Sequence, residues 1–149
     1  MKYFAFYGTL RKGQYNFFRC MCDGYDEKAP LKEGVEYIET KLVKDSPWKM
    51  LSLGGYPMIL ERNENIYDVV VDVFKIDNRQ VEKRIELMEQ GAGYEEREFP
   101  LTLKDGTTIE CHMWVASKES AKWYKKYPVI ISGDWVTRNS EVELNETVQ

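Results

Sequence analysis

Two segments of the chain carry residue types that together could bind a small molecule and move a proton. Tyr7-Gly8-Thr9-Leu10 follows a short apolar run, and its glycine lets the backbone turn sharply and lets a ligand approach the main chain. Successive backbone N–H groups after such a turn can form a concave anion site. Glu89, five residues before Tyr94, offers a carboxylate that could act as a base. These segments predict a small-molecule site with one acidic catalyst.

The segment that carries Glu89 is predicted to be an amphipathic helix over residues 78–89. Asp77 is a suitable N-cap, and Gln80 three residues later completes a capping-box pattern. The glycines that follow are expected to end the helix. Its apolar residues recur at helical spacing and form one stripe, made of Val81, Ile85 and Met88.

Glu89 lies closest to that apolar stripe among the acidic residues of the helix. At about 100° per residue it is roughly 80° from the stripe, whereas Glu82 is about 100° and Glu86 about 140° away. It also lies at the helix C-terminus, where the macrodipole disfavours a negative charge. Burial and the dipole would both raise the pKa of its carboxyl group and make it a better base. A half-buried glutamate that only hydrogen-bonds a neighbouring loop is the alternative.

Other polar residues fit structural functions more readily than catalytic ones. Thr9 has no base and orienting group near it in sequence, so its hydroxyl is expected to cap the loop. Arg11 could receive a carboxylate or carry a solvated loop charge. His112 lies in a predicted strand, on the face opposite Cys111, with no second histidine, so a structural or exposed position is expected.

The composition limits the class of protein. The 149 residues suffice for one domain, which we assign to residues 1–139, followed by a polar tail over 140–149. A net charge of −4 gives no basic footprint for a nucleic acid. No apolar run approaches the length of a membrane span and no secretory leader is recognised, so a cytoplasmic protein without a membrane partner is expected.

The three cysteines argue against a disulfide framework, because an odd number in a chain of this size is typical of a reducing compartment. Cys20, Cys22, Cys111 and His112 could in principle hold zinc, but their spacing matches no common zinc motif. Free, partly buried thiols are the preferred interpretation. We therefore predict no metal and no cofactor.

The remaining periodicity is mostly that of β-strands. Strands are predicted over residues 2–7, 33–43, 49–53, 58–60, 67–76, 99–103 and 107–116, with a hairpin signal at Lys104-Asp105-Gly106. A short helical turn is expected over 16–21, and the residues after 116 are expected to be irregular. Many strands and one good helix predict an α+β domain, namely a small mixed β-barrel with flanking helices.

Six short segments of the chain stand together in the order and spacing of a known protein family. They are YGTLR at 7–11, GGYP at 54–57, VFKI at 73–76, IELME at 85–89, Gly93-Tyr94, and SGDW at 132–135. In this combination the chain, over residues 2–136, resembles the gamma-glutamyl cyclotransferase-like proteins. The branch that it most resembles is that of gamma-glutamylamine cyclotransferase and the AIG-like proteins.

This resemblance implies a compact β-barrel with flanking helices and a pocket at one mouth. The loop after the first strand would bind a gamma-glutamyl group through the backbone N–H groups of Gly8, Thr9 and Leu10. The family's catalytic glutamate falls on Glu89, and Tyr7 and Tyr94 match the tyrosines that line the pocket. The implied partner is thus a small-molecule gamma-glutamyl substrate.

The implied reaction releases 5-oxoproline and a free amine from a gamma-glutamyl amine or peptide. The substrate's own α-amine attacks the γ-carbonyl, so the protein must supply positioning and one acid/base, here Glu89. Asp72 stands where the family often has glycine, and Glu86 where it often has aspartate, which leaves pocket depth and substrate identity open. The leaving amine and the oligomeric state are not indicated by the sequence.

Two other functions remain open at this point. The first is a non-catalytic small-molecule or partner-binding domain on the same scaffold, suggested by those departures and by the aromatic C-terminal segment. The second is a metal-dependent hydrolase that uses Cys20, Cys22 and His112.

Overall fold

The computed structural model describes residues 1–138, in which seven strands and three helices are found. The strands are β1 (Lys2–Phe6), β2 (Val35–Ser46), β3 (Trp48–Ser52), β4 (Pro57–Glu61), β5 (Tyr67–Ile76), β6 (Tyr94–Thr102) and β7 (Thr108–Ala116). The helices are α1 (Tyr15–Met21), α2 (Arg79–Gly91) and α3 (Lys118–Tyr124). This mixture of elements confirms the predicted α+β class. The predicted tail over 140–149 lies outside the described residues, as does residue 139.

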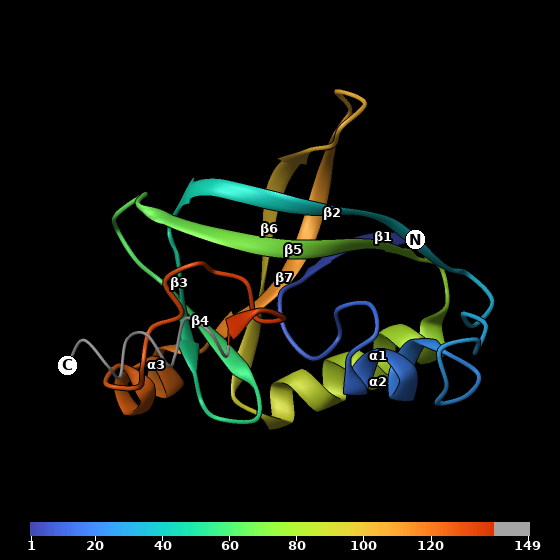
Figure 1. The fold of residues 1–149 in the computed structure, drawn as a ribbon, viewed down its shortest axis with the longest axis horizontal. Helices are drawn as coiled ribbons and strands as arrows, with labels where there is room; N and C mark the ends of the chain where they lie inside the picture. The colour runs from blue at the N-terminus through green and yellow to red at the C-terminus, as the bar shows by residue number, and fades with distance from the viewer. Residues whose placement is uncertain (139–149) are drawn as a thin grey trace.

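The larger sheet is centred on β1 and has the strand order β2-β5-β1-β7-β6 (Figure 1). β1 runs antiparallel to β5 and parallel to β7, so that Phe4 lies opposite Phe74 on one side and His112 on the other. β3 and β4 form a separate two-stranded sheet. Because β1 is the middle strand, the loop that follows it begins in the interior of the protein.

The strands form a mixed parallel and antiparallel sheet, as predicted, but its two edge strands do not pair with each other. β2 and β6 are the edges of the five-stranded sheet, so the described strands do not close into a hydrogen-bonded barrel. The long β2–β5 pair crosses the β6–β7 hairpin, which projects away from the rest of the protein (Figure 1). One side of the sheet is covered by helices (Figure 1).

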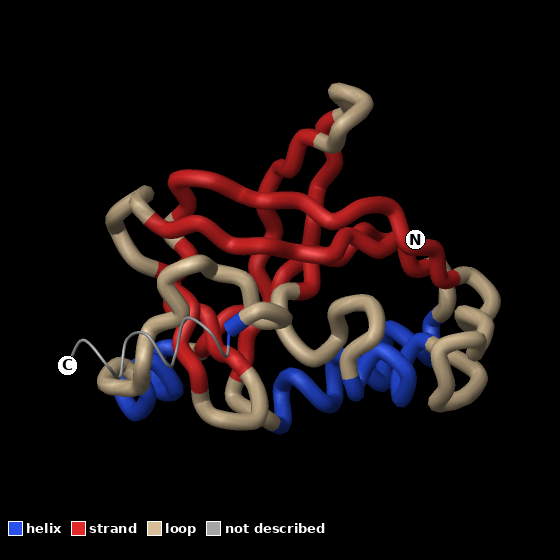
Figure 2. The backbone as a smooth tube through the Cα atoms, viewed as in Figure 1, coloured by secondary structure: helices blue, strands red, loops and turns tan. Residues whose placement is uncertain are grey.

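Helices α1 and α2 lie together on that side of the protein (Figure 2). In α2 the predicted apolar stripe faces inward, with Val81 and Ile85 buried and Met88 half-buried. The N-cap prediction was wrong by one residue. Asn78, in extended conformation, accepts hydrogen bonds from the N–H groups of Gln80 (3.1 Å) and Val81 (3.2 Å). Asp77 instead uses its own N–H to pair with the Gly34 carbonyl oxygen, which holds it outside the helix.

Two further elements differ from the sequence-based prediction. β6 begins at Tyr94 rather than at residue 99, because pairing with β7 and not apolar alternation makes its polar first half a strand. Residues 118–124 form helix α3 where irregular structure was expected. Its N-cap is Ser117, whose hydroxyl accepts a hydrogen bond from the Ser120 N–H (3.1 Å).

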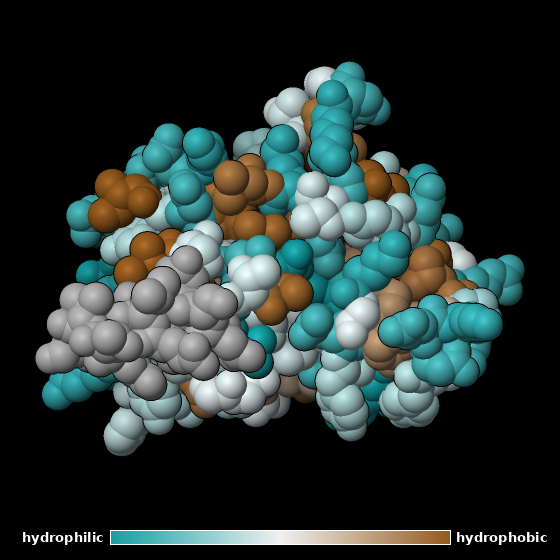
Figure 3. Space-filling view, in the orientation of Figure 1, coloured by the Kyte–Doolittle hydropathy of each residue, from teal (hydrophilic) through white to brown (hydrophobic). Residues whose placement is uncertain are grey.

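The hydrophobic core lies between the sheet and helices α1 and α2, and it is built around fully buried residues of β5 such as Phe74. On the face shown in Figure 3, hydrophobic side chains form separate groups among hydrophilic ones. None of the described helices is long and apolar enough to span a membrane.

Candidate active site

A pocket of about 400 Å³ opens where the loop after β1, the β3–β4 turn and the C-terminal half of α2 approach one another. This volume is in the usual range for small-molecule sites. The lining residues are Ala5, Phe6, Tyr7, Gly8, Thr9, Leu10, Tyr15, Asn16, Gly55, Tyr56, Pro57, Met88, Glu89, Ala92, Tyr94 and Trp114. All six site residues predicted from the sequence therefore lie on one pocket. Their functions remain predictions.

Glu89 projects into this pocket from the last turn of α2. Burial raises the pKa of its carboxyl group from 4.5 to about 8, because removal from water disfavours the charged form. Within residues 1–138, no ion pair or hydrogen bond of this carboxyl group offsets that effect. A carboxyl group with a pKa near neutrality and no partner among these residues is suited to accept and return a proton.

Gly8 is needed for close packing against the β3–β4 turn. A Cβ atom at this position would lie 2.7 Å from Cγ and 2.9 Å from Cδ of the Pro57 ring, which is closer than real Cβ contacts. The sequence indicates that this glycine allows a sharp turn and close approach of a ligand. The structure adds that its missing side chain lets the two walls of the pocket touch.

The loop after Gly8 directs its carbonyl groups back toward its own chain. The Gly8 oxygen accepts a hydrogen bond from the Arg11 N–H (3.0 Å), and the Thr9 oxygen accepts from the N–H groups of Asn16 and Phe17. The Thr9 hydroxyl accepts a hydrogen bond from the Asn16 side-chain amide (2.7 Å), as expected for a capping hydroxyl. Among the described residues, the N–H groups of residues 8–10 have no hydrogen-bond partner, so they can receive a ligand.

The Tyr7 hydroxyl is fully engaged within the protein. It donates to the Trp114 carbonyl oxygen (2.7 Å) and accepts from the Ile59 N–H (3.3 Å). Burial raises the pKa of this tyrosine well above its usual value, and the neighbouring Tyr94 and Glu89 add to the effect. Tyr7 therefore gives the pocket a neutral aromatic wall and joins β1 to β4 and β7.

Tyr94 fixes the opposite wall. Its hydroxyl donates a hydrogen bond to the Pro57 carbonyl oxygen (2.5 Å). Burial is the main cause that raises the pKa of this tyrosine, and the nearby Glu89 carboxyl group contributes. Tyr94 thus holds the proline against which Gly8 packs.

Arg11 binds carboxylates of the protein itself and is not a solvated loop charge. Its side chain is buried outside the pocket lining, with Nη1 2.6 Å from an Asp134 carboxylate oxygen and Nε 3.4 Å from Asp72. Asp72 also accepts hydrogen bonds from the Lys12 N–H (2.8 Å) and the Thr40 hydroxyl (2.7 Å). Asp72, which stands where the family often has glycine, therefore anchors the loop after β1 from outside the pocket, and its side chain does not line the pocket.

Several pocket residues were not singled out as site residues by the sequence. The Gly55–Pro57 turn was a visible motif, but only the fold places it opposite Gly8. Trp114 reaches the pocket through the parallel pairing of β1 with β7, for which no local signal exists. Two buried polar atoms of this lining have no partner within the described part of the chain, namely Trp114 Nε1 and Asn16 Oδ1.

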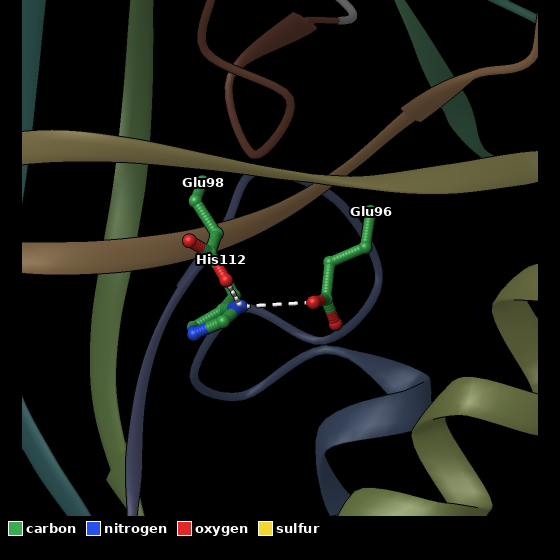
Figure 4. A group of neighbouring side chains, drawn as sticks. All are labelled: Glu96, Glu98 and His112. Carbon is green, nitrogen blue, oxygen red and sulfur yellow. Dashed lines mark hydrogen bonds and ion pairs between the residues drawn. The ribbon is translucent and has the colours of Figure 1, made fainter.

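The zinc arrangement considered from the sequence does not form. The three cysteines are buried and free, and within residues 1–138 no cysteine belongs to a group of metal-ligating atoms with His112. His112 instead meets two glutamates of β6 (Figure 4). Its Nδ1 lies 2.9 Å from a Glu96 oxygen and 3.7 Å from a Glu98 oxygen. This contact holds the imidazole ring against Phe4, outside the lining of the pocket.

The sequence matches the family described as "Gamma-glutamyl cyclotransferase, AIG2-like" over residues 4–137. No curated protein matches the chain. The matched range includes the whole pocket, from the loop after β1 to the end of α2 and the strands behind it.

Solved structures share this fold at low sequence identity. An uncharacterised protein from Pyrococcus horikoshii is 19% identical with a TM-score of 0.60, and the match covers 100% of this chain and 98% of that protein. An AIG2-like protein from Mus musculus is 17% identical with a TM-score of 0.61, covering 87% and 85%. YkqA from Bacillus subtilis is 17% identical with a TM-score of 0.61, covering 99% and 43%. At these identities the likeness shows the fold alone.

Proposed function

The chain belongs to the gamma-glutamyl cyclotransferase, AIG2-like family, and we propose that it releases 5-oxoproline and a free amine from a gamma-glutamyl amine or peptide. The observation that carries this proposal is Glu89. Its half-buried carboxyl group, whose pKa desolvation raises to about 8, is unpaired within the described residues and lines the same pocket as the loop with free N–H groups.

The chemistry requires little from the protein, because the substrate contains its own nucleophile. The α-amine attacks the γ-carbonyl carbon, a five-membered ring forms, and the bond to the leaving nitrogen breaks. No water is consumed. Holding the substrate in a reactive conformation can contribute up to about 7–11 kcal/mol in favourable intramolecular systems.

Glu89 would take the proton released by the α-ammonium group and return a proton to the leaving amine. Its raised pKa suits both transfers, since a group that titrates near the working pH can act in either direction. Such a positioned acid/base contributes about 10²–10⁴-fold to the rate.

The free N–H groups of Gly8, Thr9 and Leu10 would bind the substrate carboxylate or the oxyanion that develops on the γ-carbonyl. The hydroxyl groups of Tyr7 and Tyr94 are already used within the protein, so these tyrosines would shape the pocket and exclude water.

The test is mass-spectrometric detection of 5-oxoproline after incubation with a panel of gamma-glutamyl amines and dipeptides. We expect product from the wild type and a loss of at least about 10²-fold in kcat for Glu89→Gln, with a melting transition at pH 6 that is no lower than that of the wild type. Product formation by Glu89→Gln at the wild-type rate would refute the catalytic assignment. Ligand-dependent stabilisation without product from any substrate would favour a binding domain instead.

A further inference from the structure

The lining of the active-site pocket contains almost no charge. Among residues 1–138, Glu89 is the one lining residue of an acidic or basic type, and the other titratable residues of the lining are tyrosines. Arg11, the one lysine or arginine that is buried among residues 1–138, is already paired with Asp72 and Asp134 outside the lining. Within residues 1–138, an anionic leaving amine would therefore meet no cation in the lining, and a cationic one would meet no carboxyl group other than Glu89.

A neighbouring cavity has a charged lining, in contrast to the active-site pocket. It is lined by Glu82, Glu86, Glu95 and Glu96 together with Lys2, so it is strongly charged. The buried side chains of Tyr94 and Trp114 belong to both linings and form the wall between the two spaces. Charge is thus available close to the active site, but on the far side of a wall that the hydrogen bond from Tyr94 to Pro57 holds in place.

The depth of each lining residue indicates where the leaving amine lies. The loop after β1 and the walls formed by Phe6, Leu10 and Trp114 are buried, whereas two aromatic side chains at the mouth are exposed. Tyr15, at the start of α1, is 66% exposed, and Tyr56, in the β3–β4 turn, is 39% exposed. A gamma-glutamyl group bound at the buried loop would direct its leaving group outward, toward these two rings.

On the premise of the cyclotransferase reaction, we propose that the site selects gamma-glutamyl amides whose leaving amine is uncharged and aromatic or apolar. Tyr15 and Tyr56 are the specificity-determining residues that contact this amine at the mouth. Aromatic rings recognise apolar and aromatic groups through buried area and ring contacts. A charged amine would lose part of its hydration without gaining a partner.

The first experiment compares three substrates that differ only at the end of the leaving amine. They are gamma-glutamylpentylamide, gamma-glutamylputrescine, in which an ammonium group replaces the terminal methyl group, and the counterpart with a carboxylate there. We expect kcat/KM for either charged amide to be at least about tenfold lower than for the pentylamide. Equal or better turnover of a charged amide would overturn the inference while leaving the proposed reaction intact.

The second experiment tests the two tyrosines by the ratio of kcat/KM for gamma-glutamylbenzylamide to that for gamma-glutamylethylamide. Tyr15→Ala and Tyr56→Ala should each lower this ratio by about two- to tenfold, because the short ethyl group does not reach the mouth. Tyr25→Ala is the matched control, since Tyr25 is 70% exposed and lies outside the pocket lining. An unchanged ratio in both pocket variants would overturn the assignment of the two residues.

A third variant reverses the charge preference. Tyr56→Glu supplies the missing counter-charge at the mouth and should raise kcat/KM for gamma-glutamylputrescine relative to the pentylamide by about tenfold. A purely structural contribution of Tyr56 would not produce this reversal. Absence of 5-oxoproline from every amide would overturn the proposed function and this inference together.

Discussion

The Tyr94 hydroxyl donates a 2.5 Å hydrogen bond to the carbonyl oxygen of Pro57 and so joins the start of β6 to the β3–β4 turn. The ring of the same proline lies where a side chain at Gly8 would stand. Three segments far apart in the sequence are thereby fixed around one pocket. Each of these contacts is expected to contribute both to stability and to the shape of the site.

Tyr94→Phe should lower both stability and activity. Loss of the hydroxyl removes a buried hydrogen bond, which costs about 1–2 kcal/mol of the free energy of unfolding. It also frees the turn to move away from Gly8, which should lower kcat/KM. Denaturant titration and the 5-oxoproline assay measure the two effects. Tyr25→Phe, at an exposed tyrosine, is the control and should change stability by less than about 0.5 kcal/mol.

Gly8→Ala should destabilise the protein by about 1–3 kcal/mol, since the new methyl group must displace the rigid Pro57 ring. The control is Gly91→Ala in α2, where a Cβ atom meets no heavy atom within 4 Å. In a helix this change should stabilise by about 0.5–1 kcal/mol. Thermal denaturation of the two variants side by side provides the measurement. A harmless alanine at position 8 would contradict the packing explanation.

Glu89 should make stability depend on pH in a predictable direction. Its pKa is about 8 in the folded protein and about 4.5 when exposed, so between these values the folded state binds one proton more than the unfolded state. This contribution to the free energy of unfolding therefore falls as pH rises, by about 1.4 kcal/mol per pH unit between about 4.5 and 8. Glu89→Gln removes the dependence and should be more stable than the wild type at pH 9.

Urea titrations of wild type and Glu89→Gln at several pH values measure this difference directly. The stability difference between the two proteins should grow from pH 5 to pH 8 and then remain constant. A difference that does not vary with pH would show that the carboxyl group is not buried in its neutral form.

Arg11→Met should be strongly destabilising although Arg11 does not line the pocket. The change leaves the buried Asp72 carboxylate and its partner Asp134 without their cation, which typically costs about 3–5 kcal/mol. Denaturant titration is the measurement. Lys83→Met breaks an exposed pair with Glu86 (3.9 Å) and serves as the control, with an expected effect below about 1 kcal/mol. Similar costs for the two variants would contradict the anchoring function of Arg11.

The sequence by itself determined the α+β class and the elements whose signals are local. The valine-rich, β-branched residues of 67–76 predicted β5, and the spacing of Val81, Ile85 and Met88 predicted the buried face of α2. That same spacing distinguishes Glu89 from the other acidic residues of the helix. Such signals are readable because a helix or strand places side chains on one face at a fixed period.

The tertiary structure alone decided which distant residues meet. Arg11 pairs with Asp72 and Asp134, Trp114 enters the pocket, and Pro57 packs on Gly8, although nothing in the local sequence of either partner indicates the other. The polar start of β6 is a strand because β7 offers hydrogen-bond partners, which overrides weak local propensity. Local periodicity specifies which face of a helix or strand is buried. Which distant segment packs against that face is determined only by the packing of the whole chain.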